Sequence, residues 1–229
     1  MPLSNQDRST LEQAEFVRGK CTQVLEAVTR AAQIVDAKKN QVLFHQDDPA
    51  TAFYIVLTGW VGIYRLGEDG NRADLGIFGP GESFAEAART MPGYPANAQA
   101  MSNVRLARID WRAIEESLQE TPGLSLALAD SIAGQLGRLV DKTSDRSLLT
   151  VSERLARYLF DKCRDERRPS SVRLPFAKAL LARDLGVSPE TLSRAFAELA
   201  RSGVTIEHRN VHVHDRDALR QTSCSRSAR

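Results

Sequence analysis

The apolar positions between residues 32 and 110 fall in short runs, and each run is followed by residues that favour turns. The turns contain Gly, Pro, Asn or Asp, as in residues 67–70 and 79–81. Short β-prone runs spaced roughly 8 to 12 residues apart indicate a small antiparallel barrel or roll. Before it, residues 1–30 predict one or two short packed helices. The expected strands are residues 34–35, 42–44, 52–57, 60–66, 75–78 and 104–109.

A helical period replaces the strand pattern from residue 111 to about residue 162. Apolar residues recur there every three to four positions, which predicts a long helix that begins near Pro122. We expect its apolar seam to be a homodimer interface; the alternative is a helix that lies on its own roll. Residues 143–150 predict a polar hinge, and residues 151–163 a second amphipathic helix. The seam consists of Leu124, Leu128, Ile132, Leu136, Leu139 and Val140, and the predicted interface residues are Leu128, Ile132, Leu136 and Leu139.

A shorter helix is predicted from residue 188 to residue 199. Ser188 suits the N-cap position, and Pro189 suits the first helical position because its missing N–H is not needed there. Upstream, residues 176–185 predict another short helix that ends at Gly186. Two short helices joined by such a turn indicate a helix-turn-helix. The apolar stripe of the second helix is Leu192, Ala195, Phe196 and Leu199.

The other face of this helix carries Glu190, Ser193 and Arg194, whose chemistry fits the edges of DNA bases. An arginine fork matches the O6 and N7 acceptors of guanine, and a glutamate accepts from the amino group of cytosine. The alternative is a solvated face in which Glu190 complements the helix dipole and pairs with Arg194. Ser188 and Thr191, at the start of the helix, join the predicted DNA-binding set.

Downstream, residues 204–206 and 211–213 predict the two strands of a wing hairpin. Its turn contains Arg209, which completes the predicted DNA-binding set. Residues 164–171 are expected to form a charged loop, and the tail from Thr222 is expected to be disordered.

Charge is distributed unevenly along the 229 residues, although the formal net charge is only +2. Residues 1–120 carry 12 Lys and Arg against 16 Asp and Glu, whereas residues 169–229 carry 10 against 6. The positive end is therefore the end that carries the helix-turn-helix, as phosphate contacts require. No apolar run approaches a membrane span and the N-terminus lacks an apolar signal segment, so we expect a cytoplasmic protein.

The three cysteines, Cys21, Cys163 and Cys224, form no CxxC pair, so neither a disulfide framework nor a metal cluster is supported. No metal site is predicted. Cys163 falls in a helical pattern, where a half-buried structural residue is the first interpretation and a redox role the second.

A roll, a long helix and a winged helix-turn-helix, in that order, resemble the Crp/Fnr family of bacterial transcription regulators. The resemblance rests on FYIVLTGWVGIYRL, FGPGESFAEA and GVSPETLSRAFAEL and covers nearly the whole chain. It implies an α+β fold with an N-terminal antiparallel β-roll of the cyclic-nucleotide-binding type, divided at 1–120, 121–145 and 146–229. It also implies a homodimeric activator that binds double-stranded DNA and RNA polymerase. The E-x-x-S-R pattern resembles the Fnr side of the family, which implies a TTGAT-type half-site.

The effector implied by the resemblance depends on the segment between residues 81 and 98. The family's cyclic-nucleotide cassette closes with an Arg that holds the phosphate, but residues 94–98 contain no Arg. A buried phosphodiester without such a donor is poorly compensated, so a cyclic nucleotide is not expected. The N-terminus also lacks the cysteines of an iron–sulfur cluster. Glu82, Phe84 and Tyr94 are the predicted effector pocket.

SFAEA and YPANAQA resemble the Dnr/NnrR branch, which implies control of denitrification genes in response to nitric oxide. An apolar crevice between roll and long helix would suit haem as a cofactor, and His45 is the first ligand to test because it is the only histidine in the roll. Two other hypotheses stay open. One is a regulator that needs no effector. The other is a cupin-like metalloenzyme, which a roll with one histidine does not favour; we therefore expect no enzyme.

Overall fold

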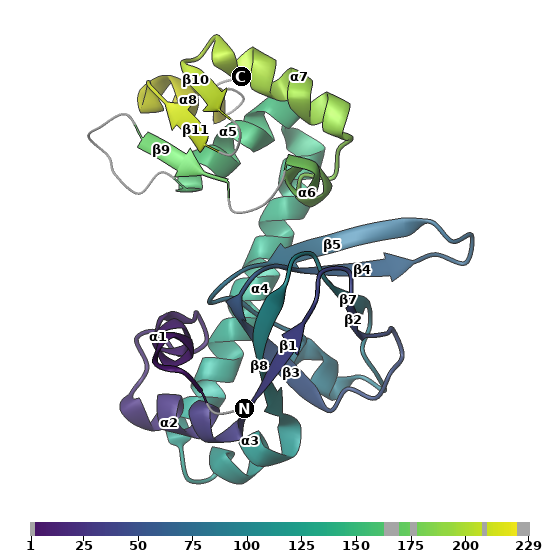
Figure 1. Ribbon diagram of the computed structural model, residues 1–229, viewed down its shortest axis with the longest axis vertical. Helices are drawn as coiled ribbons and strands as arrows, with labels where there is room; N and C mark the ends of the chain where they lie inside the picture. The colour runs from purple at the N-terminus through teal and green to yellow at the C-terminus, as the bar shows by residue number, and fades with distance from the viewer. Residues whose placement is uncertain (1–2, 163–169, 175–177, 208–209, 224–229) are drawn as a thin grey trace. The chain divides into compact units, whose positions relative to one another are not determined.

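The computed structural model describes residues 3–162, 170–174, 178–207 and 210–223 (Figure 1). The chain forms two compact units, residues 1–137 and residues 138–229. The long helix α4, Pro122–Leu148, contributes its first half to one unit and its end to the other.

The first unit contains a roll of two four-stranded antiparallel sheets, with strand orders β1-β8-β3-β6 and β2-β7-β4-β5. All six predicted strand regions are present. Two short strands were missed. Strand β6 has only two residues, and β7, Asn97–Ala100, contains no β-branched or aromatic residue. The strands are β1 Ala32–Ala37, β2 Val42–Phe44, β3 Ala52–Thr58, β4 Val61–Leu66, β5 Arg72–Phe78, β6 Ser83–Phe84, β7 Asn97–Ala100 and β8 Val104–Asp110.

Strand β3 is buried on both faces, because the roll covers one face and helices cover the other. Phe53, Ile55 and Leu57 belong to the core shared with the helices, while Tyr54 and Val56 point into the roll. The side chains alternate because successive residues of a strand face opposite sides of the sheet. Figure 1 shows the helices that share the outer core near β1, β3 and β8. They are α1 Asn5–Gln13, α2 Thr22–Ala31, α3 Trp111–Leu118 and the start of α4.

The predicted hinge at residues 143–150 is wrong for most of its length. Helix α4 continues through Leu148, and only residues 149 and 150 separate it from α5, Val151–Lys162. The polar side chains of this segment do not end the helix, because Ser and Thr hydroxyls bond to carbonyls one turn earlier. Thr143 donates to Leu139 and Ser147 donates to Thr143.

The second unit confirms the winged helix-turn-helix. Strands β10, Val204–Glu207, and β11, Asn210–Val213, pair as the predicted hairpin, and β9, Ser170–Arg173, adds a third strand where a loop was expected. The expected disordered tail is wrong at its start, because Thr222 lies in α8, Arg216–Ser223. The two helices of the motif are α6, Lys178–Asp184, and α7, Pro189–Ala200.

A buried ion pair fixes α1 to the roll. Asp7 is 3% exposed and caps α1 reciprocally with Ser4, while its carboxylate receives the Arg105 guanidinium at 3.0 Å. Arg105 also pairs with Asp36 on β1. Burial opposes ionisation of Asp7, but the hydrogen bonds from Arg105 and Ser4 outweigh it and hold the pKa of Asp7 below its ordinary value of 3.8.

We expect Asp7→Ala to lower the free energy of unfolding by roughly 1–3 kcal/mol at pH 7, because it removes a charged hydrogen-bond acceptor and leaves Arg105 with one partner fewer. The depressed pKa means that the carboxylate stabilises the fold above pH 3.8 and loses this effect as the pH falls through the folded-state pKa.

Denaturant unfolding of parent and variant as a function of pH measures the difference. The difference should shrink on acidification; a gap that is constant down to pH 3 would contradict the ionic role of Asp7. The matched control is Asp141→Ala, an exposed aspartate of α4.

Candidate functional site

The turn between α6 and α7 is set by backbone geometry. Gly186 has φ +66°, a left-handed conformation that glycine adopts without a Cβ penalty. The N–H of Gly186 donates to Arg183 and that of Val187 to Ala182, which is the Schellman pattern at a helix end. Two residues later the Ser188 hydroxyl accepts from the Thr191 N–H at 3.2 Å and starts α7. The sequence prediction of both caps is confirmed.

Helix α7 has one buried and one exposed face. Leu192, Ala195, Phe196 and Leu199 are buried. Glu190, Ser193 and Arg194 are exposed together on the N-terminal half of the helix. The two remaining helical candidates, Ser188 and Thr191, are joined to each other in the cap. The last candidate, Arg209, lies outside the described residues.

The N-terminal half of the exposed face of α7 is polar and carries one negative and one positive side chain, Glu190 and Arg194. The carboxyl of Glu190 accepts from its own backbone N–H and from Ser188, and these bonds, with the charge of Arg194, hold the pKa of Glu190 below its ordinary value of 4.5. The Ser193 hydroxyl donates to the Pro189 carbonyl at 2.9 Å. The arrangement therefore places an ionised acceptor, a hydroxyl and a guanidinium side by side near the start of a helix.

The end of α4 supports this motif through contacts that the sequence pattern did not indicate. Lys142 pairs with Asp184 of α6 at 2.6 Å, and Asp145 pairs with Arg157 of α5. The two partners of these pairs are 42 and 12 residues apart in the sequence, so helical periodicity carried no signal for either pair. The ion pairs fix the helix-turn-helix to the last turns of α4.

An apolar face of α4 is exposed beyond the first unit's core. Ile132, Leu136, Leu139 and Val140 are 41%, 60%, 57% and 56% exposed. Leu124, at the start of the predicted seam, is instead fully buried in the chain's own core, and Leu128 is half-buried against it. The exposed residues recur every three or four positions, so they lie on one side of the helix.

Two of the predicted effector residues lie inside the roll. Tyr94 stacks on Phe44 with ring centroids 3.8 Å apart, and Phe84 stacks on Tyr54 at 5.2 Å. The Tyr94 hydroxyl donates to the Ala52 carbonyl at 2.8 Å, and burial raises the pKa of this tyrosine. The third residue, Glu82, accepts from the Gly79 N–H at 2.7 Å. Side chains of the protein itself therefore fill the space around Phe84 and Tyr94.

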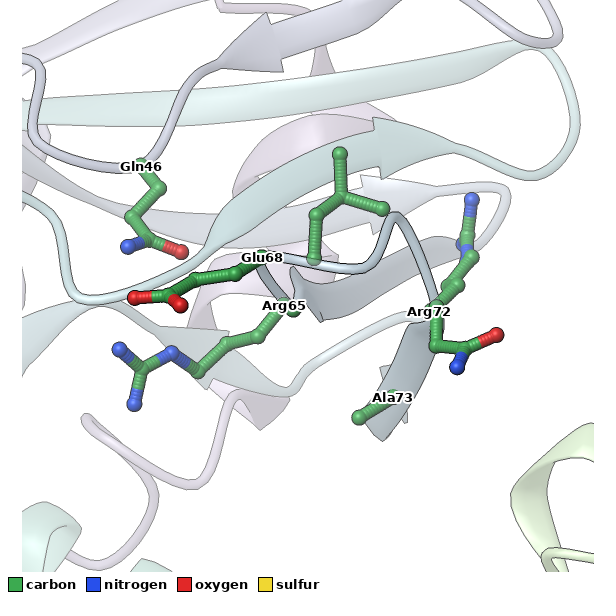
Figure 2. A pocket seen from close by; sticks show the side chains of 8 residues that line it. Gln46, Arg65, Glu68, Arg72 and Ala73 are labelled. Carbon is green, nitrogen blue, oxygen red and sulfur yellow. The ribbon is translucent and has the colours of Figure 1, made fainter.

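A surface groove of about 550 Å³ lies elsewhere, at the end of the β4–β5 hairpin. In Figure 2, Gln46 points from a neighbouring loop toward the hairpin that carries Arg65, Glu68 and Arg72. The Arg72 guanidinium is committed to Asp74, at 2.9 Å. None of the predicted effector residues lines this groove.

The roll meets α4 through polar side chains at the place where an apolar crevice was expected. Ser83 of β6 and Glu86 of the short helix η1, Glu86–Thr90, contact Ser131 and Gln135 of α4. We call these four residues the Glu86 cluster. The expected crevice is therefore closed here by hydrogen bonds.

Histidines do not gather in the described residues. His45 is exposed in the loop after β2. His212 lies on β11 and His214 directly follows this strand, with the two ring centroids 6.4 Å apart. The His214 ring bonds to the Thr205 hydroxyl at 3.0 Å. Within the described part of the chain, no three His, Cys, Asp or Glu side chains are placed to share a metal, and no helix is long and apolar enough to cross a membrane. Cys163 lies outside the described residues.

Comparisons with known proteins assign both units. Residues 34–121 match the family model of the cyclic nucleotide-binding domain, and residues 153–222 match that of the Crp-like helix-turn-helix domain. The nitrogen fixation regulation protein FixK of Rhizobium meliloti is 31% identical over 80% of this chain and 83% of its own. A solved structure of a putative cAMP-binding regulatory protein from Silicibacter pomeroyi is 28% identical, with TM-score 0.68, over 96% of this chain and 100% of its own. The crystal structure of DNR from Pseudomonas aeruginosa is 29% identical, with TM-score 0.52, over 96% of this chain and 99% of its own.

A nucleotide-binding-type roll, a long helix and a winged helix-turn-helix define a DNA-binding transcription regulator. The chain belongs to the Crp/Fnr family. Its relatives are transcription regulators and not enzymes, so the cupin-like metalloenzyme hypothesis is set aside.

We expect Ile132→Asp to convert the protein to monomers, because a carboxylate on the exposed face of α4 would be buried without a partner if that face is the dimer interface. Light scattering at micromolar concentration measures the mass.

Met91→Asp is the matched control, since Met91 is 44% exposed and lies in the loop after η1 and not on α4. The control should leave the mass unchanged. A dimeric Ile132→Asp variant would place the interface on another surface.

Proposed function

We propose that the protein is a homodimeric, sequence-specific transcription regulator that inserts α7 of each subunit into the major groove of a palindromic operator. The observation that carries the proposal is the exposed group of Glu190, Ser193 and Arg194 on the N-terminal half of a helix whose start is fixed by Ser188. In helix-turn-helix proteins this half of the second helix contacts the base edges.

Each of the three side chains has a definite use in base reading. The Arg194 fork suits the two acceptors of guanine, while the ionised Glu190 suits the amino group of the paired or neighbouring cytosine. Ser193 exchanges its bond to the Pro189 carbonyl for one to a base or phosphate. Ser188 and Thr191 at the start of α7, together with Arg209, supply phosphate contacts, which fix the register and carry no sequence information.

A dimer explains why one short helix suffices for specificity. A single α7 contacts only a few base pairs, but two copies related by a two-fold axis read two half-sites about one DNA turn apart. The exposed residues Ile132, Leu136 and Leu139, with Leu128 at the edge, supply the apolar surface that such a dimer would bury.

The target and the signal are the finer part of the proposal. The E-x-x-S-R pattern supports a TTGAT-like palindrome, and SFAEA and YPANAQA support activation of anaerobic or denitrification genes in response to nitric oxide. The similarity to DNR adds to this resemblance. In this proposal the protein acts in the cytoplasm and contacts RNA polymerase. Its cofactor is left open, and haem is the candidate to test.

A second candidate is a regulator of the same operator that needs no effector. The filled interior of the roll favours it, because Phe44, Tyr54, Phe84 and Tyr94 stack on one another where Phe84 and Tyr94 were expected to line a pocket. A ligand that entered there would have to displace Tyr94 from the Ala52 backbone.

We expect Arg194→Ala to weaken binding to a TTGAT palindrome by at least tenfold, because a bidentate guanine contact is worth ~1–3 kcal/mol and the dimer makes two. Fluorescence anisotropy with a labelled operator measures the affinity, and light scattering checks that the dimer is intact.

Arg201→Ala removes the same charge from the opposite end of α7, where Arg201 is exposed, and serves as the control. Arg201→Ala should reduce the affinity for all DNA sequences by the same factor, and this factor should be smaller than the loss caused by Arg194→Ala. Equal affinity of Arg194→Ala and parent for the palindrome would contradict the base-reading role.

We expect cyclic AMP and cyclic GMP at millimolar concentration to leave operator affinity unchanged, because residues 94–98 offer no arginine to a phosphate. Haem with nitric oxide should change it and should give a Soret band. His45→Ala is the first ligand variant, since His45 is the only histidine in the roll and its side chain is exposed.

A response to cyclic AMP would contradict the first half of this expectation. Absence of a Soret band on haem titration would contradict the second and leave the effector-independent candidate.

A further inference from the structure

The Glu86 cluster joins the roll to α4 through a chain of directed hydrogen bonds. Ser131 donates to Glu86 Oε1 at 2.8 Å, and the amide of Gln135 donates to Glu86 Oε2 at 2.8 Å. The hydroxyls of Ser83 and Ser131 are 3.1 Å apart. Because the single proton of Ser131 is given to Glu86, Ser83 donates to Ser131. Both oxygens of the carboxylate are thereby occupied by α4.

Three of the four cluster residues are buried in the first unit, and Gln135 is half-buried beside them. Glu86 and Ser83 are each 1% exposed, and Ser131 is 8% exposed. Among the described residues no cation pairs with Glu86; its carboxylate is held by neutral donors. A carboxylate in such a place is poorly compensated as soon as either donor moves away. The free energy of burying the Glu86 carboxylate therefore depends steeply on the position of α4.

The backbone directly before Glu86 has a disfavoured conformation. Ala85, the residue before it, has φ +72°, which brings the Cβ of a non-glycine residue too close to its own backbone. Such residues persist where the surrounding structure determines them, and they occur frequently at switch regions. The segment that contains Ala85 and Glu86 is the same segment that lies between β6 and the α4 contact.

The position of α4 matters beyond the roll. Its free apolar face belongs to the first unit up to Leu136, and its last turns carry Lys142 and Asp145, which fix the helix-turn-helix. A shift or rotation of α4 against Ser83 and Glu86 changes which residues the helix offers to a second subunit. Packed helices shift between discrete arrangements, so a local change is passed on to the whole helix.

We propose that Glu86 is the positioning residue through which the roll sets α4, so that operator affinity depends on the Glu86 cluster although none of its residues touches DNA. This inference rests on the proposed function as a DNA-binding dimer. In a regulator without an effector, the cluster fixes one arrangement of α4 permanently. In a regulator with an effector, the ligand acts by exchanging this buried contact for another one. The proposal is therefore independent of which signal the roll receives.

The test exchanges the two groups of the central hydrogen bond. Gln135→Glu places two carboxylates against each other in a buried site and removes the donor to Glu86, so it should break the cluster. The double variant Glu86→Gln with Gln135→Glu restores one amide and one carboxylate, now on opposite elements. It also restores the net charge of the parent. Gln23→Glu, on the exposed face of α2, is the control for an added negative charge.

Operator affinity, dimer mass and thermal unfolding are measured for the four proteins at a temperature where all are folded. We expect Gln135→Glu to change operator affinity at least tenfold while the dimer persists, and the double variant to return to within about threefold of the parent. Gln23→Glu should behave as the parent. Affinity of Gln135→Glu equal to that of the control would overturn the positioning role, as would a double variant that fails to recover.

A second measurement separates failure of this inference from failure of the proposed function. Hydrogen exchange of α4 residues 128–137, followed without DNA, should accelerate in Gln135→Glu and recover in the double variant. If the parent shows no preference for the palindrome, the proposed function fails, and the exchange data still decide whether the cluster holds α4. Unchanged exchange in Gln135→Glu would overturn the cluster itself.

Discussion

One helix has to satisfy the cores of two units. The first turns of α4 bury Leu124 and Ala127 in the core of the first unit, and its last turns carry the ion pairs of Lys142 and Asp145 to α6 and α5. The contacts at both ends of α4 are therefore fixed by packing and ion pairs within the subunit. Between these ends, Ile132, Leu136, Leu139 and Val140 keep their apolar side chains exposed on one side of the helix. The regulator we propose uses this middle part for dimerisation.

Under the positioning role that we propose for Glu86, regulation through α4 needs no large rearrangement. The roll contacts the helix through a few buried hydrogen bonds around Glu86, whose partners must be within about 3 Å to compensate the carboxylate. Apolar contacts alone would tolerate small shifts of the helix, whereas directed bonds to a buried charge do not. The aromatic stack of Phe44, Tyr54, Phe84 and Tyr94 fills the roll behind this contact. The filled roll and the distance-dependent hydrogen bonds from α4 to Glu86 are together what the proposed two-state switch requires.

Local sequence patterns predicted most of the helices and strands, because most of them are determined by residues close together in the sequence. The caps at Gly186 and Ser188 and the stripe of α7 depend only on residues within one or two turns, and they are present as expected. Strand β7 was missed because Asn97–Ala100 is stabilised by its neighbours β2 and β4 and not by its own propensity. The hinge predicted at residues 143–150 was wrong because the polar side chains of this segment were interpreted as the end of the helix. Its Ser and Thr hydroxyls bond back to the helix instead. The Glu86 cluster has no signal in the sequence, since its halves are about 45 residues apart.

The central claim is that two copies of α7, held at a fixed separation by the α4 dimer, read the two halves of a palindrome. Hydroxyl-radical footprinting on a series of TTGAT palindromes with different centre-to-centre spacings tests it most directly. The account predicts two protected half-sites and strongest binding at one spacing near ~10 base pairs or a multiple of it, with loss of binding when ~5 base pairs are inserted. Equal protection at all spacings, or protection of a single half-site, would contradict the account.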